Sequence, residues 1–217
     1  MKAKQTLQAY QALTLMHWML IILVMLLSFT TGSMATETEP DSPQQVVHNL
    51  QTSLLQAMRE GEQLDYQARF EFLAPAIDQS HDIDMIIKTI LGATFWSELS
   101  PEQQVLITDT FRQLSIATYA GRFTQYDGER FEITEQRELP RDQVLVRSQL
   151  IKGDGGSVNF DYVLHQLSGQ WYIVNILFDG VSDLAIKRSE YRAVLQRDGF
   201  SALIDMLEEK IILAKPN

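Results

Sequence analysis

The chain has 217 residues, of which 45% are hydrophobic and 21% are charged, a composition typical of a globular protein and not of a disordered one. Its formal net charge of −10 disfavours nucleic acids and anionic membrane surfaces as partners. The complete lack of cysteine excludes disulfides, thiolate metal sites and cysteine nucleophiles.

The first 35 residues have the order of a secretory signal peptide. Two lysines precede a long apolar stretch, and Ser33 and Ala35 suit the −3 and −1 positions of a cleavage site. We predict that residues 1–35 are removed by cleavage after Ala35, which takes two positive charges from the net −10 and leaves −12. Export of an acidic protein without cysteine fits a bacterial periplasm. The alternative is an uncleaved anchor, because the apolar residues 12–29 approach the minimum length of a membrane span.

A polar leader over residues 36–43, with two prolines, precedes one predicted domain over residues 44–217. Apolar residues at helical spacing predict a helical first half of this domain. The expected helices are one begun by Ser42 and ended at Gly61, one over residues 66–77 broken at Pro75, one from Asp82 to Gly92, and a long one from Ser100 to about Phe123.

The hydrophobic period changes from 3.6 to 2 after these helices, which predicts strands. Four runs are separated by short turns and should form an antiparallel meander: residues 131–139, 143–151, 157–167 and 170–178. The fourth run is apolar on both faces apart from Asn175, so we expect it to lie centrally and to be covered on both sides. Two helical stretches, about 183–197 and 200–213, follow.

The expected fold class is therefore α+β. It consists of a twisted four-stranded antiparallel sheet with N- and C-terminal helices that enclose an apolar pocket, as in an NTF2-like cone.

Two candidate catalytic or metal-binding motifs have simpler structural interpretations. Ser182 stands in the sequence D-G-V-S-D, which lacks the second glycine of a nucleophile elbow, so we interpret it as a helix cap. His81 and its two neighbouring aspartates resemble a metal-ligand cluster, but no comparable ligand spacing accompanies them, and Asp82 as a helix cap explains the motif. We predict no catalytic residue, no metal site and no cofactor.

An enzyme acting on an apolar small molecule stays open as an alternative. Asp161, His165 and Asp179 could meet near the sheet as an acid–base set. Strand alternation, however, directs the first two away from the apolar face that would border a pocket.

The remaining bulky residues are apolar, and the sequence leaves open whether they fill a core or border a cavity. For a cavity, the expected lining residues are Phe70, Leu73, Ile87, Leu91, Phe95, Phe111, Leu114, Tyr119, Val146, Phe160, Tyr162, Ile173 and Leu177. A positive patch of Lys187, Arg188 and Arg192 is either a solvated helix face, a docking surface or a contact for a phosphate.

Two long stretches resemble one known family. Residues 171–211, with a strand begun by tryptophan, a G-V-S turn, a helix, a glycine and a last helix, are similar to the end of the periplasmic MlaC and toluene-tolerance proteins. Residues 99–123 are similar to the long central helix of that family. The resemblance covers about residues 44–213. Residues 117–133 and the segment DGVSDLAIKRSEY resemble the hopanoid-associated branch called HpnM.

The resemblance implies a soluble lipid carrier without catalytic residues. Such a protein holds phospholipid acyl chains or a hopanoid between sheet and helices, and moves between an inner-membrane transporter complex and an outer-membrane lipoprotein or exporter. Two acyl chains of about sixteen carbons represent on the order of 25 kcal/mol of hydrocarbon to shield, which requires an enclosed cavity. We expect Lys187, Arg188 and Arg192 to contribute to docking or to contact the headgroup. Asn175 departs from the acid expected there in the family. A membrane-tethered adaptor without ligand is a further alternative.

Overall fold

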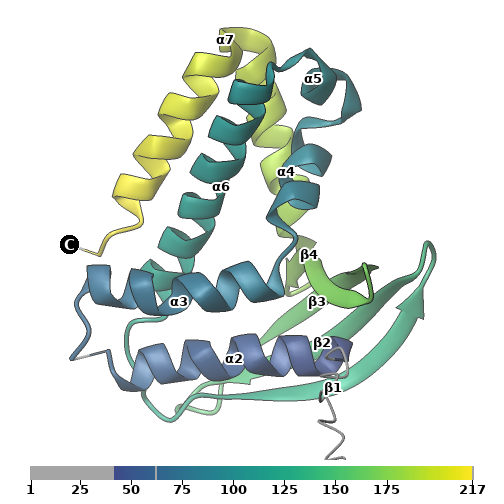
Figure 1. The fold of residues 1–217 in the computed structure, drawn as a ribbon. Helices are drawn as coiled ribbons and strands as arrows, with labels where there is room; N and C mark the ends of the chain where they lie inside the picture. Colours follow the sequence, from purple (N-terminus) through teal and green to yellow (C-terminus); the bar gives the residue numbers. More distant parts are fainter. Residues whose placement is uncertain (1–41, 62, 217) are drawn as a thin grey trace, which may run out of the picture. The chain divides into compact units, whose positions relative to one another are not determined.

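The structure, a computed structural model, describes residues 42–61 and 63–216 (Figure 1). Its helices are α2 (Pro43–Arg59), α3 (Tyr66–Ser80), α4 (Ile83–Leu91), α5 (Ala93–Glu98), α6 (Pro101–Arg122) and α7 (Asp183–Leu213), and its strands are β1 (Arg130–Leu139), β2 (Gln143–Ile151), β3 (Ser157–Leu167), β4 (Gln170–Phe178) and β5 (Val181–Ser182). None of these helices combines the length and the apolar character needed to cross a bilayer. The predicted signal peptide and the anchor alternative lie outside the described residues.

The strands form one antiparallel sheet in the order β1-β2-β3-β4-β5, which confirms the α+β class and the predicted meander. The prediction of four strands is wrong, because Val181 and Ser182 add a short fifth strand that pairs with the end of β4. The central position expected for β4 is also wrong, since its outer edge carries only this two-residue strand. Its apolar residues are explained by helices, because α2, α3, α4 and α7 all contact β4.

A β-bulge sets the faces of β4. Its register with β3 shifts between Asn175 and Ile173, which leaves Val174 without a partner on β3. Because of this extra residue, Ile173 pairs with Leu164 while Ile176 pairs with Tyr162, although strict alternation would direct residues 173 and 176 to opposite faces. The bulge therefore brings both isoleucines into the same core.

Two hydrophobic cores fill the fold, and α6 contributes to both. The first core lies between the sheet and α2 and α3, which cover one face of the sheet in Figure 1, and includes Leu54, Leu73 and Tyr162. The second core packs α4, α6 and α7 around Ile107 and Leu203. In the first core, helices pack against the sheet, and in the second core, helices pack only against one another.

Two helix boundaries show where local sequence signals succeed and fail. Gly199, which lies between the two predicted helical stretches, interrupts α7 with φ 86°, so that the last half of α7 folds back beside the first (Figure 1). The predicted break at Pro75 is wrong, because α3 continues through it to Ser80. Proline removes one helical hydrogen bond there, and the burial of Leu73 and Ile77 on either side stabilises the helix across it.

The junction between α3 and α4 is tied to the sheet. The backbone N–H of Asp82 donates to the carbonyl of Ile173 on β4 at 3.1 Å. The carboxylate of Asp82 caps α4 by accepting from the N–H of Met85 at 2.8 Å, and its second oxygen lies 2.8 Å from Nε2 of His165 on β3. One aspartate therefore holds the start of α4 against two strands.

We predict that Asp82→Ala lowers the free energy of unfolding by about 2–3 kcal/mol, since it removes a helix cap and a half-buried partner of His165. Asp84→Ala is the matched control, because Asp84 is exposed in the first turn of the same helix, and it should cost less than about 0.5 kcal/mol. Urea denaturation followed by circular dichroism measures both. Equal losses for the two variants would contradict this role of Asp82.

Candidate functional site

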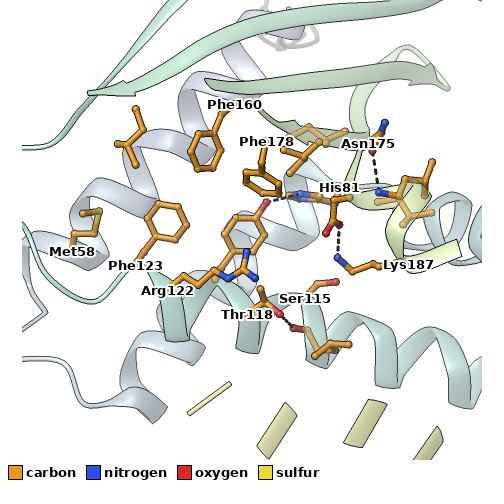
Figure 2. A pocket seen from close by; sticks show the side chains of 18 of the residues that line it. Met58, His81, Ser115, Thr118, Arg122, Phe123, Phe160, Asn175, Phe178 and Lys187 are labelled. Carbon is orange, nitrogen blue, oxygen red and sulfur yellow. Dashed lines mark hydrogen bonds and ion pairs between the residues drawn. The ribbon is translucent and has the colours of Figure 1, made fainter. Parts of the chain in front are cut away.

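A cavity of about 470 Å³ lies between the two cores. The sheet contributes Phe160 and Phe178, α2 contributes Met58, and the residue after α6 is Phe123 (Figure 2). From the second core, Phe111 closes the cavity toward α4 and α7. The hollow is therefore bounded mainly by aromatic and aliphatic side chains where the two cores stop short of each other.

One face of α6 forms the long wall of this cavity. Leu114, Ser115, Thr118, Tyr119 and Arg122 recur at steps of three and four residues, which places them on one side of the helix. The two small residues leave room in the hollow. Their hydroxyls donate to carbonyls of their own helix, at 2.9 Å for Ser115 and 2.7 Å for Thr118, so neither presents an unsatisfied donor to an apolar ligand.

A chain of hydrogen bonds crosses the wall at His81. Nδ1 of His81 lies 2.8 Å from Oγ of Ser80, and Nε2 lies 3.2 Å from the hydroxyl of Tyr119. Because the Ser80 hydroxyl donates its proton to the carbonyl of Ala76, at 2.5 Å, Oγ must accept from Nδ1–H. We assign the Nδ1–H tautomer on this ground, with the Tyr119 hydroxyl donating to Nε2.

Burial keeps this pair uncharged. It lowers the pKa of His81 to about 4, and the favourable influences of the Ile77 carbonyl and of Asp183 do not offset it. Burial also raises the pKa of the Tyr119 hydroxyl well above its usual value, although the ring keeps some exposed surface toward the cavity. At neutral pH the His81–Tyr119 pair is therefore a neutral, fully hydrogen-bonded part of the wall.

Asn175 connects β4 to the start of α7 at the cavity wall. Its side-chain oxygen accepts from Oγ of Ser182 at 3.1 Å and from the N–H of Leu184 at 3.2 Å. Ser182 in turn accepts from the N–H of Ala185 at 3.1 Å, so its predicted role as a helix cap is confirmed. At this position the amide makes two acceptor contacts without placing a charge beside the apolar hollow.

The comparisons with known proteins agree with one another. The family model for the MlaC protein matches residues 48–209. This chain belongs to the MlaC family. The toluene tolerance protein ttg2D of Pseudomonas putida is 22% identical over 181 residues, which is 82% of either chain. The intermembrane phospholipid transport system binding protein MlaC of Haemophilus influenzae is 24% identical over 55% of this chain and 58% of its own.

A solved structure has the same fold. The phospholipid-binding protein from Ralstonia solanacearum, determined in complex with a phospholipid, aligns with a TM-score of 0.70. The alignment covers 81% of this chain and 100% of the Ralstonia chain, and the two sequences are 23% identical. The MlaC fold of this chain is thus supported by sequence and by structure.

Some of the residues that the sequence predicts as pocket lining border the cavity, and others lie elsewhere. Those at the cavity are Phe111, Leu114, Tyr119, Phe160 and Ile173. Those packed in or against the sheet-side core are Phe70, Leu73, Val146 and Tyr162. Ile87, Leu91 and Phe95 pack in or against the all-helical core, and Leu177 is half-buried on β4. Periodicity identifies buried faces, but it does not indicate which buried side chain adjoins a void.

Sequence reasoning missed the polar part of the wall. Ser115, Thr118 and Arg122 share the helical face of Leu114, and that spacing was a usable signal. The predicted lining contains only bulky apolar residues, so it does not include these three. Phe178 was missed for another reason, since the bulge at Val174 changes which residues of β4 face inward.

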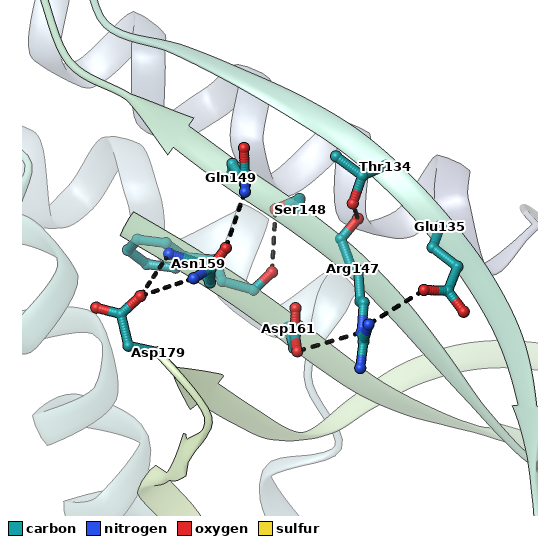
Figure 3. A network of polar contacts seen from close by, with 9 residues as sticks. Thr134, Glu135, Arg147, Ser148, Gln149, Asn159, Asp161 and Asp179 are labelled. Carbon is teal, nitrogen blue, oxygen red and sulfur yellow. Dashed lines mark hydrogen bonds and ion pairs between the residues drawn. The ribbon is translucent and has the colours of Figure 1, made fainter. Parts of the chain in front are cut away.

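The acid–base set of the enzyme alternative does not assemble. Asp161 faces Arg147 at 3.6 Å, and Asp179 accepts from the backbone and side-chain nitrogens of Asn159 at 3.0 and 2.9 Å (Figure 3). His165 pairs with the helix cap of α4, as described above, and none of the three borders the cavity. Within the described ranges no group of three acidic or histidine side chains is arranged to hold a metal ion.

The predicted positive patch divides into separate environments. Lys187 borders the cavity and forms an ion pair with Asp183 on its own helix. Arg192 donates to the carbonyl of Ile90 at 2.8 Å, and its guanidinium packs where a side chain on Gly92 would lie. Arg188 is exposed, on a groove that Arg192 also borders. Arg192 thus has a structural role, whereas Lys187 borders the cavity and Arg188 is exposed on the surface groove.

We predict that protonation of His81 makes stability fall in acid. Its folded pKa of about 4 lies below the ordinary 6.5, so the unfolded chain binds the extra proton first as the pH falls between these values. The loss reaches about 3 kcal/mol near pH 4 and is absent above about pH 6.5.

His81→Gln should remove this part of the pH dependence, while His48→Gln, on an exposed position of α2, should keep it. Urea denaturation at about pH 7.5 and about pH 4.5 measures the difference. An unchanged pH dependence in His81→Gln would show that other groups cause it.

Proposed function

We propose that this member of the MlaC family is a periplasmic carrier that holds one acyl chain of a phospholipid in the cavity between its two cores. The observation that carries the proposal is the 470 Å³ hollow bounded by aromatic and aliphatic side chains. Family membership supports it, as do the named functions of the relatives: an intermembrane phospholipid transport system in Haemophilus and phospholipid binding in the Ralstonia protein.

The cavity has the size of one acyl chain. A cavity of about 150 Å³ holds one benzene molecule, so the hollow corresponds to about three of them, or roughly eighteen carbon atoms. Burial of a sixteen-carbon chain, at about 0.8 kcal/mol per methylene, is worth about 13 kcal/mol. That amount offsets the free-energy cost of extracting one chain from a membrane into the protein.

The wall chemistry favours a carrier over an enzyme. Phe111, Leu114, Phe160 and Ile173 offer hydrocarbon to the ligand, and the hydroxyl groups of α6 are satisfied within the helix. The histidine on the wall, His81, is held neutral with a pKa of about 4, far from the value near 7 that suits a general base. Binding without chemistry is the simplest use of such a surface.

The cellular setting follows from the sequence and the family. Residues 1–35 have the order of a signal peptide, with cleavage proposed after Ala35. A mature charge of −12 would repel anionic bilayers, so exchange is proposed to occur by docking to an inner-membrane transporter complex and an outer-membrane lipoprotein or exporter. A hopanoid is the second candidate cargo, favoured by the resemblance of residues 117–133 to the HpnM branch.

Ser115→Phe should abolish lipid binding without unfolding the protein, because the new ring would occupy the cavity beside Tyr119. Gln113→Phe is the matched control, since Gln113 is exposed on the same helix and does not border the cavity. Native mass spectrometry of each purified protein, followed by solvent extraction, measures bound lipid. Wild-type protein and the control should carry phospholipid. Wild-type protein that repeatedly emerges without lipid would contradict the proposal.

Arg188 is proposed as a docking residue, because it is exposed and has no hydrogen bond or ion pair among the described residues. Arg188→Glu should weaken lipid transfer to acceptor membranes that contain the transporter complex, with lipid content unchanged. Arg197→Glu is the control, since Arg197 is exposed elsewhere on α7 and forms an ion pair with its neighbour Asp198. Equal transfer by wild type and Arg188→Glu would remove Arg188 from the docking surface.

A further inference from the structure

A second cavity, of about 550 Å³, adjoins the first one between α6 and the two halves of α7. The two cavities share five lining residues, namely Leu114, Thr118, Arg122, Asp183 and Lys187. On its outer side the second cavity is bounded by the end of α7, where the carbonyl of Ala214 lies within 2.0 Å of the place a Cβ on Gly121 would occupy. Such a close approach of two backbones requires glycine at position 121.

The second cavity is cationic although the chain is strongly acidic. Four of its lining residues are positively charged and two are negatively charged: Arg122, Lys187, Lys210 and Lys215 against Asp183 and Glu190. The two acids are already engaged, because Asp183 pairs with Lys187, and Oε1 of Glu190 lies 2.8 Å from Nζ of Lys210. The excess positive charge therefore belongs to the two remaining cations.

Of these two cations, Arg122 is the one that faces both cavities. It has no hydrogen bond or ion pair with any described residue, whereas the ammonium group of Lys215 lies over the ring of Tyr66 at 5.7 Å. Figure 2 shows Arg122 extending from α6 toward the interior of the first cavity. A guanidinium group offers two parallel N–H donors to a phosphate, which is its preferred partner together with carboxylate.

Two acids of the first cavity do not border the second one. The carboxylates of Asp127 and Glu129, which lie with Lys152 on the first cavity only, would repel a phosphate there. In a phospholipid the phosphate is joined to the acyl chains through glycerol, so a phosphate site has to adjoin the hydrocarbon cavity. Arg122 satisfies this condition, because it stands on the wall that the two cavities share.

We propose that the second cavity binds the anionic phosphate of the lipid headgroup, with Arg122 as its direct ligand, while an acyl chain occupies the first cavity. This assignment rests on the proposed function, and it fixes the orientation of the lipid. The headgroup lies between α6 and α7, and the hydrocarbon extends toward the sheet. Lys187 stands beside this site and can exchange its contact with Asp183 for one with the phosphate.

The test compares two ligands with the same single chain, oleoyl lysophosphatidylglycerol and monooleoylglycerol, which differ by the phosphoglycerol group. Wild-type protein should bind the phosphate-bearing lipid about tenfold more tightly, the effect of one charge-assisted hydrogen bond. Arg122→Gln should remove this preference while its affinity for monooleoylglycerol stays the same, and Arg122→Lys should restore part of it. Arg197→Gln, which changes an exposed cation of α7 that borders neither cavity, should keep the full preference.

The outcomes separate this inference from the proposed function. Binding of neither lipid by wild-type protein would overturn both. Binding of both lipids, with the same preference in wild type and Arg122→Gln, would overturn the headgroup assignment and leave the carrier in place. Inorganic phosphate serves as the third probe. If it alone bound at Arg122 as tightly as the lysolipid, the site would be one for free phosphate and the assignment to a headgroup would fail.

Discussion

The segment Ser80–Asp82 holds the two cores in place, and the cavity depends on it. Its backbone bonds to Ile173 of β4, and its aspartate both caps α4 and faces His165 of β3. Its histidine contacts Tyr119 of α6 across the cavity wall. This short junction is fixed to two strands and two helices. It therefore holds the first core, between the sheet and α2 and α3, at a set distance from the second core of α4, α6 and α7. A hollow persists between them that close packing would otherwise remove.

An apolar hollow of this size is stable only if its polar groups are satisfied without the ligand. The hydroxyls of Ser115 and Thr118 bond to their own helix, and His81 and Tyr119 bond to each other. Each buried donor on this part of the wall is therefore paired within the protein. A hydrocarbon chain can enter and leave without breaking any of these hydrogen bonds, which is what reversible carriage requires. A buried polar group without a partner would penalise the empty state, whereas the exposed Arg122 is hydrated when no ligand is bound.

Local sequence signals determined most of the fold, because they act over a few residues. Alternation placed the four long strands, the hydroxyl of Ser100 formed the predicted cap of α6, and Gly199 divided α7. The failures needed information from distant parts of the chain. Pro75 stays helical because of burial that α3 gains from its neighbours, and β4 is apolar on both faces because helices cover it near the edge of the sheet. Lining residues such as Phe178 depend on a bulge that periodicity does not reveal.

Helix α6 contributes both to the proposed site for the acyl chain and to the proposed site for the phosphate. Its middle supplies Phe111 to the first cavity, while its last turn supplies Arg122 to the cationic one. Since a helix rises 1.5 Å per residue, these eleven positions span about 16 Å, which is comparable with the length of an amphiphile from headgroup to mid-chain. A rigid element thus presents hydrocarbon and positive charge at a fixed separation. An amphiphilic ligand is the kind of molecule that can satisfy both surfaces at once, whereas a purely apolar ligand would leave Arg122 without a partner.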